Sequence, residues 1–174
     1  MKYISTRQQQ ATNIKTAILK GLADDGGLFM PEYIPQLDSE FFENLPNLTL
    51  QEIGFRVAKE FLGESISDDN LKEIIDEVLN FEIPAVKISE NIYSLELFHG
   101  PTMAFKDGGA RFMARMMSYF SEGKPMKVIA ATSGDTGSAV ASGFFGVPGI
   151  EDYILYPKGK VGPLQEKQVT TWGG

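Results

Sequence analysis

Hydrophobic residues recur at helical spacing through much of the first 80 residues. An apolar side chain at every third or fourth position predicts an amphipathic helix, because those positions share one helix face. The pattern predicts helices over residues 13–22, 49–61 and 67–79, and a short one that contains Phe41 and Phe42. Residues 49–52, T-L-Q-E, fit a capping box at a helix start. We expect these apolar positions to be core: Ile14, Ala17, Ile18, Leu22, Ile53, Val57, Phe61, Leu71, Ile74, Ile75, Val78 and Leu79.

From residue 85 the helical spacing gives way to shorter runs. Residues 85–89 and 91–98 predict two strands that form a hairpin around Glu90 and Asn91. A long helix follows, with Arg111 and Arg115 opposite an apolar side made of Ala110, Phe112, Met113, Met116, Met117 and Phe120. A buried strand at 127–132 and a strand at 152–156 then alternate with helices at 138–145 and 162–171. This order predicts βαβ units and a parallel sheet.

The predicted fold class is therefore α/β, with a mainly helical first part, a small hairpin and the start of a parallel-sheet domain. Two parallel strands cannot cover themselves, because parallel sheets are normally covered on both faces. The sequence stops at Trp172-Gly173-Gly174, directly after a predicted helix and before any further strand. We therefore expect these residues to be the N-terminal part of a longer protein.

Composition narrows the class of protein. The 174 residues are 43% hydrophobic, which is typical of a globular chain. The net charge of −7 argues against broad contact with nucleic acid or an acidic membrane surface. With no cysteine and one histidine, His99, we expect no metal site. No apolar run approaches the ~18 residues of a membrane span, and the first residues do not resemble a signal peptide. We expect a cytoplasmic protein.

One lysine, Lys106, stands where a strand-like segment gives way to a helix. It lies between Phe105 and Asp107 in E-L-F-H-G-P-T-M-A-F-K-D-G-G-A, residues 96–110. A cation at a helix N-terminus is poorly placed against the helix dipole, so the amine should lose its proton more easily. Such an amine is a nucleophile toward carbonyl groups. Lys106 is therefore a candidate catalytic residue; the alternative is a solvated lysine beside a packed phenylalanine.

A second candidate site is the strand-to-helix turn T-S-G-D-T-G-S at residues 132–138. Its glycines let backbone N–H groups converge, and the helix N-terminus adds positive potential, so the turn suits a carboxylate or phosphate. It is neither a P-loop nor a dinucleotide-binding G-x-G-x-x-G. Its G-x-x-G spacing is like that of a KH loop, but an aspartate within it and the acidic chain argue against nucleic acid. An ordinary βα connection is an equally good interpretation of these residues alone.

A hydrolase triad of Ser133, His99 and Asp135 is a weaker alternative. No G-x-S-x-G nucleophile elbow is present to expose a catalytic serine. His99 is better interpreted as a hydrogen-bonded turn residue.

Four segments together resemble pyridoxal-phosphate enzymes of the tryptophan-synthase-β type, and among them the threonine synthase family. They are GLADDGGLFMPE (21–32), ELFHGPTMAFKD (96–107), ATSGDTGSA (131–139) and YPKGKVGPLQEKQ (156–168). They come in the family's order and span nearly the whole chain, and the first separates threonine synthases from related dehydratases and cysteine synthases. Gly108 and Gly162 depart from the family pattern, where a bulkier residue and a serine are expected.

The resemblance implies a threonine synthase N-terminal domain, residues 1–95, and the first part of a pyridoxal-phosphate-binding catalytic domain, residues 96–174. It implies a β,γ-replacement that converts O-phospho-L-homoserine and water to L-threonine and phosphate, the last step of threonine biosynthesis. Lys106 would hold pyridoxal 5'-phosphate as a Schiff base and move protons at the substrate's α and β carbons. The cofactor-binding residues so implied are Lys106, Phe105, Ser133, Gly134, Asp135, Thr136 and Gly137, and those for the substrate are Thr102, Ser133 and Thr136.

In this family the loop for the cofactor phosphate and the partner of the ring nitrogen lie further along the chain. Residues 1–174 alone are therefore expected to be inactive, with the remainder of the chain as their partner. A related pyridoxal-phosphate dehydratase is the nearest alternative activity. A small-anion-binding module that kept the fold without the chemistry is the non-enzymatic alternative.

Overall fold

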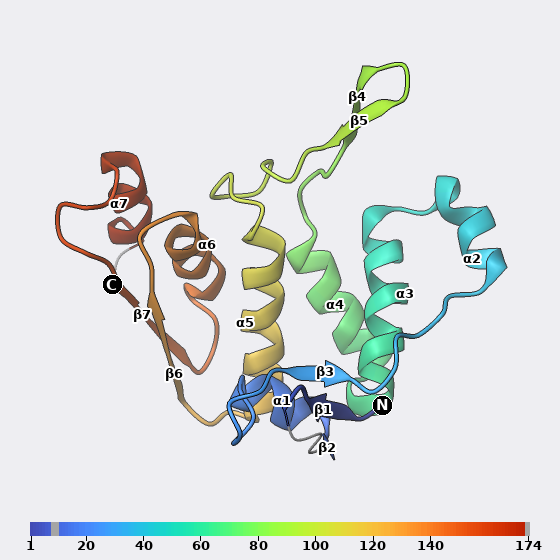
Figure 1. The fold of residues 1–174 in the computed structure, drawn as a ribbon, viewed down its shortest axis with the longest axis horizontal. Coiled ribbons are helices and arrows are strands. Elements are labelled where there is room, and N and C mark those ends of the chain that lie inside the picture. Colours follow the sequence, from blue (N-terminus) through green and yellow to red (C-terminus); the bar gives the residue numbers. More distant parts are fainter. Residues whose placement is uncertain (8–10, 173–174) are drawn as a thin grey trace. The chain divides into compact units, whose positions relative to one another are not determined.

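The computed structural model describes residues 1–7 and 11–172 of the chain. Gly173 and Gly174, at the end of the sequence, lie outside the described residues. The chain divides into two compact units, Met1–Leu79 and Asn80–Gly174 (Figure 1). The predicted α/β class, with a mainly helical first part and parallel strands in the second, is confirmed. The domain boundary predicted between residues 95 and 96 concerns the whole protein and stays a prediction.

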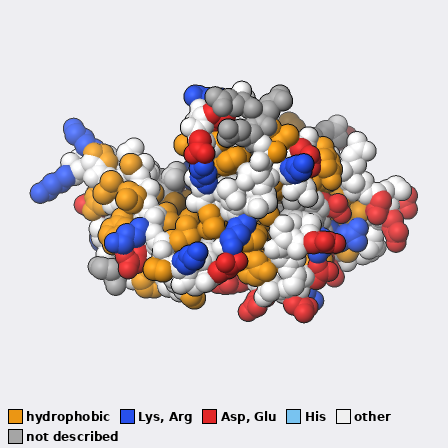
Figure 2. Space-filling view, turned by 90° about the horizontal axis from the view of Figure 1, so that it is seen from below, with side chains coloured by type: hydrophobic (Ala, Val, Ile, Leu, Met, Phe, Trp, Pro, Cys, Tyr) orange, Lys and Arg blue, Asp and Glu red, His pale blue; other side chains and the backbone are white. Residues whose placement is uncertain are grey.

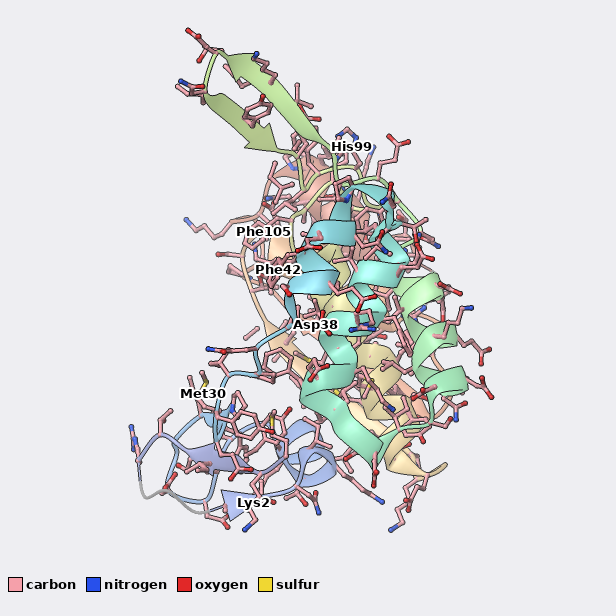
Figure 3. The ribbon with its side chains drawn as sticks, turned by 90° about the vertical axis from the view of Figure 1, so that its right-hand side faces the viewer. Lys2, Met30, Asp38, Phe42, His99 and Phe105 are labelled. Carbon is pink, nitrogen blue, oxygen red and sulfur yellow. The ribbon has the colours of Figure 1, made fainter. Side chains whose placement is uncertain are left out.

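The first unit contains a small antiparallel sheet that the sequence pattern did not predict. Its strands lie in the order β2 (Ala11–Thr12), β1 (Tyr3–Ser5) and β3 (Phe29–Pro31). Figure 3 labels Lys2 directly before β1 and Met30 in β3. Tyr3 is buried and its hydroxyl donates to the carbonyl oxygen of Phe61 at 2.9 Å, which ties the sheet to a helix of the same unit. Burial raises the pKa of Tyr3.

The described residues of the first unit also form the helices α1 (Ile14–Lys20), α2 (Ser39–Asn44), α3 (Leu50–Leu62) and α4 (Asp68–Val78), with short 3-10 turns at Leu45–Asn47 and Gly63–Ser65. Each begins at a side chain that accepts a hydrogen bond from a backbone N–H three residues on, the usual N-cap arrangement; these caps are Asn13, Asp38, Thr49 and Ser67. The predicted capping box of Thr49 and Glu52 is confirmed in both directions.

The core of this unit follows the predicted stripe of α4 and departs from the prediction elsewhere. Leu71, Ile74, Ile75, Val78, Ile14 and Ala17 are buried as expected. Leu22 is 53% exposed, because α1 ends at Lys20 and Gly21 turns the chain with a positive φ. Val57 is 37% exposed while Leu62 is 5% exposed. At about 100° of rotation per residue, Val57 lies to one side of the α3 face that contains Leu62.

The second unit opens with the predicted hairpin, which is confirmed. Strands β4 (Ala85–Ser89) and β5 (Ile92–Leu95) pair antiparallel. Their large side chains are mostly exposed, among them Ile88 at 65% and Ile92 at 61%. Hydrophobic side chains also reach the surface between charged ones on the face drawn in Figure 2.

The rest of the second unit is a βαβα arrangement, as predicted. Strands β6 (Met126–Ala131) and β7 (Ile150–Leu155) pair in parallel, and helices α5 (Asp107–Ser121), α6 (Asp135–Phe144) and α7 (Pro163–Thr170) accompany them (Figure 1). A core forms where α5, α6 and the strands meet; it contains Ala114, Phe144 and Val147, with Met117, Val128, Val140 and Ile150 packed against it.

Two burial predictions for this unit are wrong. Strand β6 is not buried on both sides: its residues alternate between half-buried and exposed, and Ile129 is 67% exposed. Strand side chains point to opposite faces in turn, and only one face of the pair is covered within residues 1–7 and 11–172. Met113 is 54% exposed, because α5 packs on α6 through a different face, which includes Ala114.

Candidate functional site

Residues 100–107 form a compact loop that leads into α5, and we call it the 100–107 loop. Asp107, 1% exposed, accepts hydrogen bonds from the backbone N–H of Thr102 at 3.0 Å and from its hydroxyl at 2.5 Å. A Cβ at Gly100 would stand 2.4 Å from Asp107 Oδ2, so only glycine fits there. The N–H of Met103 donates to the carbonyl of Gly100, which closes the turn. The loop is thus wrapped around the Asp107 carboxylate.

Lys106 is the residue that caps α5. Helical geometry begins at Asp107, and Lys106 itself is half-buried. Its Nζ lies 4.0 Å from the centre of the Phe105 ring, and Phe105 is 66% exposed. The face of an aromatic ring attracts an ammonium group within about 6 Å. The predicted location of Lys106 at a helix N-terminus is confirmed, and Phe105 contacts it directly.

Residues 133–137, which we call the 133–137 turn, follow β6 and open α6. The helix begins at Asp135 and not at Ser138 as predicted, so Asp135, Thr136 and Gly137 form its first turn. The backbone N–H groups of Asp135 and Thr136 belong to the class that has no partner inside a helix, whereas the N–H of Gly137 donates to the carbonyl oxygen of Gly134 at 3.0 Å. Gly134 is the N-cap in an extended conformation, and its N–H donates to Thr132 Oγ1 at 3.2 Å.

The residues of the 133–137 turn differ in their exposure to solvent. Ser133, Asp135 and Thr136 are exposed, whereas Gly137 is buried. A Cβ at Gly137 would stand 2.5 Å from Thr132 Cγ2, so the missing side chain lets α6 begin tight against the end of β6. The result is a helix N-terminus that presents hydroxyl and backbone donors to solvent, which suits a small anion.

Helix α7 connects the two candidate segments. Gln165 Nε2 donates to Asp135 Oδ1 at 2.9 Å. One turn later, Gln168 Nε2 donates to the carbonyl oxygen of Thr102 at 3.2 Å, and its Oε1 accepts from Ser138 Oγ at 3.2 Å. Thr102 belongs to the 100–107 loop and Ser138 directly follows the 133–137 turn. The structure thus brings Thr102, Asp135 and Ser138 together through two side chains of one helix.

Sequence reasoning missed Asp107, Gln165 and Gln168 as residues that shape this site. Gln165 and Gln168 lie three apart in a predicted helix, and that spacing places both on one face. Asp107 stands five residues after Thr102, close enough for a local turn, but nothing in the pattern marks it as buried.

The hydrogen bond that the structure gives His99 is to a glutamate and not to Ser133. His99 Nε2 pairs with Glu96 Oε2 at 2.7 Å, and its ring stacks on Phe98 at 4.7 Å between centres. The prediction that His99 is hydrogen-bonded is confirmed, and the residue lies in an irregular segment after β5. Figure 3 shows His99 and Phe105 in the connection between β5 and α5.

Two absences apply to the part of the chain that the structure describes. Over residues 1–7 and 11–172, no three His, Asp or Glu side chains gather in a way that could hold a metal ion. Within the same ranges, no helix has both the length and the apolar character needed to cross a membrane.

Chemically, the arrangement combines an amine with an anion-suited helix N-terminus in one unit. The amine can add to a carbonyl group, and the turn can hold a carboxylate or phosphate. A small molecule that carries both groups is the kind of ligand that fits.

Comparison with known proteins gives consistent results. The family model described as "Threonine synthase N terminus" matches residues 2–79. Threonine synthase of Escherichia coli strain K12 is 40% identical over 158 residues, which are 91% of this chain and 37% of that protein. Threonine synthase of Saccharomyces cerevisiae is 39% identical over 192 residues, 97% of this chain and 37% of that protein.

Solved structures agree with these relatives. The crystal structure of threonine synthase from Escherichia coli superposes with a TM-score of 0.91 at 37% identity, over 100% of this chain and 41% of that one. The structure of threonine synthase from Brucella melitensis with bound pyridoxal phosphate gives a TM-score of 0.92 at 38% identity, over 97% and 38% of the two chains. The chain spans about two fifths of the length of the relatives it matches. Residues 2–79 thus match the threonine synthase N terminus, and the chain is similar to threonine synthases over 91% or more of its length.

Proposed function

We propose that the protein containing these residues is a threonine synthase that converts O-phospho-L-homoserine and water to L-threonine and phosphate. The observation that carries the proposal is Lys106 at the N-cap of α5, in a loop that Gln168 joins to the anion-suited 133–137 turn. Similarity to threonine synthases over nearly the whole chain supports the same activity. A cytoplasmic location is part of the proposal, and fractionation of cells checks it.

The residues present fit pyridoxal phosphate as the cofactor. Lys106 would hold it covalently through Nζ, with Phe105 beside it, and the 133–137 turn would support it with Ser133, Gly134, Asp135, Thr136 and Gly137. When bound, this cofactor acts as an electron sink that makes protons next to the substrate amine removable. Gly134 leaves open space beside its backbone for a close approach, and the lysine supplies the one amine that the cofactor needs.

The chain's own residues would have distinct tasks in the reaction. Lys106 Nζ would move protons at the α and β carbons of the substrate. Backbone N–H groups of the 133–137 turn would hold the substrate carboxylate, with the hydroxyls of Ser133 and Thr136 as further donors. Thr102 already donates its hydroxyl hydrogen to Asp107, so it would contact a substrate as an acceptor.

The test uses the full-length natural gene product with added pyridoxal phosphate. We expect a visible absorbance band, and release of phosphate matched by formation of threonine from O-phospho-L-homoserine. Lys106→Ala should abolish both the band and the product. Phosphate release without threonine would favour a dehydratase-like lyase, and the absence of a band would favour an anion-binding module. A band that survives in Lys106→Ala would show that another residue holds the cofactor.

A further inference from the structure

Gln168 uses both ends of its side-chain amide inside the second unit. Its Nε2 donates to Thr102 O and its Oε1 accepts from Ser138 Oγ, each at 3.2 Å. Thr102 and Ser138 are 6% and 1% exposed, so water has little access to either residue. An amide donates from nitrogen and accepts at oxygen. Only one of its two flipped orientations therefore satisfies both partners.

We propose that Gln168 is a positioning residue that holds the 100–107 loop, and with it Lys106, at a fixed place relative to the 133–137 turn. Thr102, its first partner, donates two hydrogen bonds to Asp107, which directly follows Lys106. Ser138, its second partner, lies in α6 one residue after the turn. Gln168 thus adds a hydrogen-bonded connection through α7 between the two halves of the site, beside the packing of α5 on α6. This inference rests on the proposed function.

Hydrogen bonds inside the 100–107 loop cannot replace this connection. The bonds from Met103 N–H to Gly100 O and from Asp107 N–H to Ala104 O fix the shape of the loop. The packing of α5 on α6 fixes the end of the loop at Asp107, and the Gln168 bond holds the loop at Thr102. Gln165 adds a second bond from α7, to Asp135, one helical turn before Gln168. Helix α7 is therefore held at two points on α6, and the Gln168 side chain is presented at a defined position.

Position matters because the proposed proton transfers act on carbons held by another segment. A displacement of about 1 Å between a catalytic group and its substrate can reduce a rate by about 100-fold. Loss of the Gln168 connection is therefore expected to lower kcat more than it changes the binding of substrate by the 133–137 turn.

The first test measures the connection without the cofactor. In the full-length protein, Gln168→Met removes the donor and the acceptor at similar side-chain length, and Lys167→Met changes its exposed neighbour on α7. We expect amide hydrogen exchange in residues 100–107 to be at least about 10-fold faster in Gln168→Met, because the loop opens more often. Lys167→Met should exchange like the wild type. Unchanged exchange in Gln168→Met would overturn the inference.

The second test separates positioning from simple support of the fold. With pyridoxal phosphate bound, Gln168→Met should lower kcat by about 10- to 100-fold, with KM changed much less, and should shift the pH dependence of the visible absorbance band. Thr49→Ala serves as a variant that loses stability in the first unit, which does not contain the site. A fall in kcat no larger than that of Thr49→Ala would assign Gln168 a structural role only and overturn the proposal.

Gln168→Glu sharpens the result, since it keeps an acceptor for Ser138 and loses the donor to Thr102. We expect it to behave like Gln168→Met in both tests, and wild-type behaviour would overturn the inference. A wild-type protein with no absorbance band and no phosphate release would refute the proposed function. The exchange measurement would still decide whether Gln168 holds the loop.

Discussion

Asp107 accepts both hydrogen bonds that Thr102 can donate locally, one from the backbone N–H and one from the hydroxyl. Both residues are buried, so a lost partner cannot be replaced easily by water. Leaving a buried donor unpaired costs about 1–3 kcal/mol. The stability of the 100–107 loop therefore depends on this one carboxylate.

Asp107→Ala should lower the free energy of unfolding by about 2–4 kcal/mol, since two buried donors lose their acceptor. Asp107→Asn keeps one acceptor oxygen and should cost less. Urea unfolding of the full-length protein measures both. Glu90→Gln, at an exposed position in the hairpin turn, is the control and should change stability by less than about 0.5 kcal/mol. Equal effects of Asp107→Ala and Glu90→Gln on stability would contradict a stabilising role for the two hydrogen bonds from Thr102 to Asp107.

Thr49→Ala should lower the free energy of unfolding by about 1 kcal/mol, as is usual for loss of a helix N-cap. Thr49 Oγ1 accepts from the N–H of Glu52, and the Glu52 carboxylate accepts from the backbone N–H and the hydroxyl of Thr49. Thermal unfolding measures the change. Glu60→Gln, an exposed substitution in the same helix, is the control, and a loss as large as that of Thr49→Ala would argue against the cap.

The same capping box predicts a dependence on pH. The hydrogen bonds from the backbone and side chain of Thr49 lower the pKa of Glu52. A lowered pKa in the folded state means that the contribution is present above the ordinary glutamate pKa of about 4.3 and is lost as the pH falls through the lowered value. The stability difference between wild type and Glu52→Ala should therefore shrink between pH 7 and pH 3. A difference that stays constant over this range would rule out the ionised partner.

Asp152 in β7 should show the opposite sign. Burial raises the pKa of this carboxyl group. A raised pKa in the folded state favours the protonated form, so its contribution is fully present below about pH 4 and is lost as the pH rises through the raised value. Asp152→Asn should therefore be more stable than wild type at pH 7, by less than about 1 kcal/mol because water screens the partly exposed group. The gain should vanish below pH 4 in urea titrations, and a gain that persists there would refute burial as its cause.

Two glycines near the site should respond to alanine in opposite directions. At Gly137 the new methyl group would meet Thr132 Cγ2 at 2.5 Å, and such overpacking costs about 1–3 kcal/mol. At Gly108, in the first turn of α5, it would meet nothing within 4 Å, so alanine should add about 0.5–1 kcal/mol of stability. Paired urea midpoints compare the two variants. Destabilisation by Gly108→Ala would show that the open space is filled in the full-length protein.

Local pattern predicted the elements whose periodicity is strong. The stripe from Leu71 to Val78 appears as the buried face of α4, and the alternating runs around Glu90 form the hairpin. The strand Tyr3–Ser5 was missed, because three residues are too few to show a period of two. Val57 and Ile129 were misplaced because hydrophobic character alone does not tell which neighbour covers a face.

In the candidate site, too, local motifs could be predicted from the sequence and contacts between distant residues could not. Lys106 before a helix and the 133–137 turn are local signals, and the structure places both at helix N-termini. The bond between Gln168 and Thr102 joins residues 66 positions apart, and a side-chain contact at that separation leaves no periodic trace. The start of α6 at Asp135 was also missed, since small polar residues suit a turn and a first helical turn equally.

The glycine at position 100 also has a consequence for inheritance. Every single-nucleotide missense change in a glycine codon introduces at least a methyl group, and at Gly100 that group would collide with the Asp107 carboxylate. Natural variation should therefore be purged at this codon more strictly than at Gly108, where a methyl group would meet nothing within 4 Å. The close contact between Gly100 and Asp107 would then appear as an absence of missense alleles at the Gly100 codon.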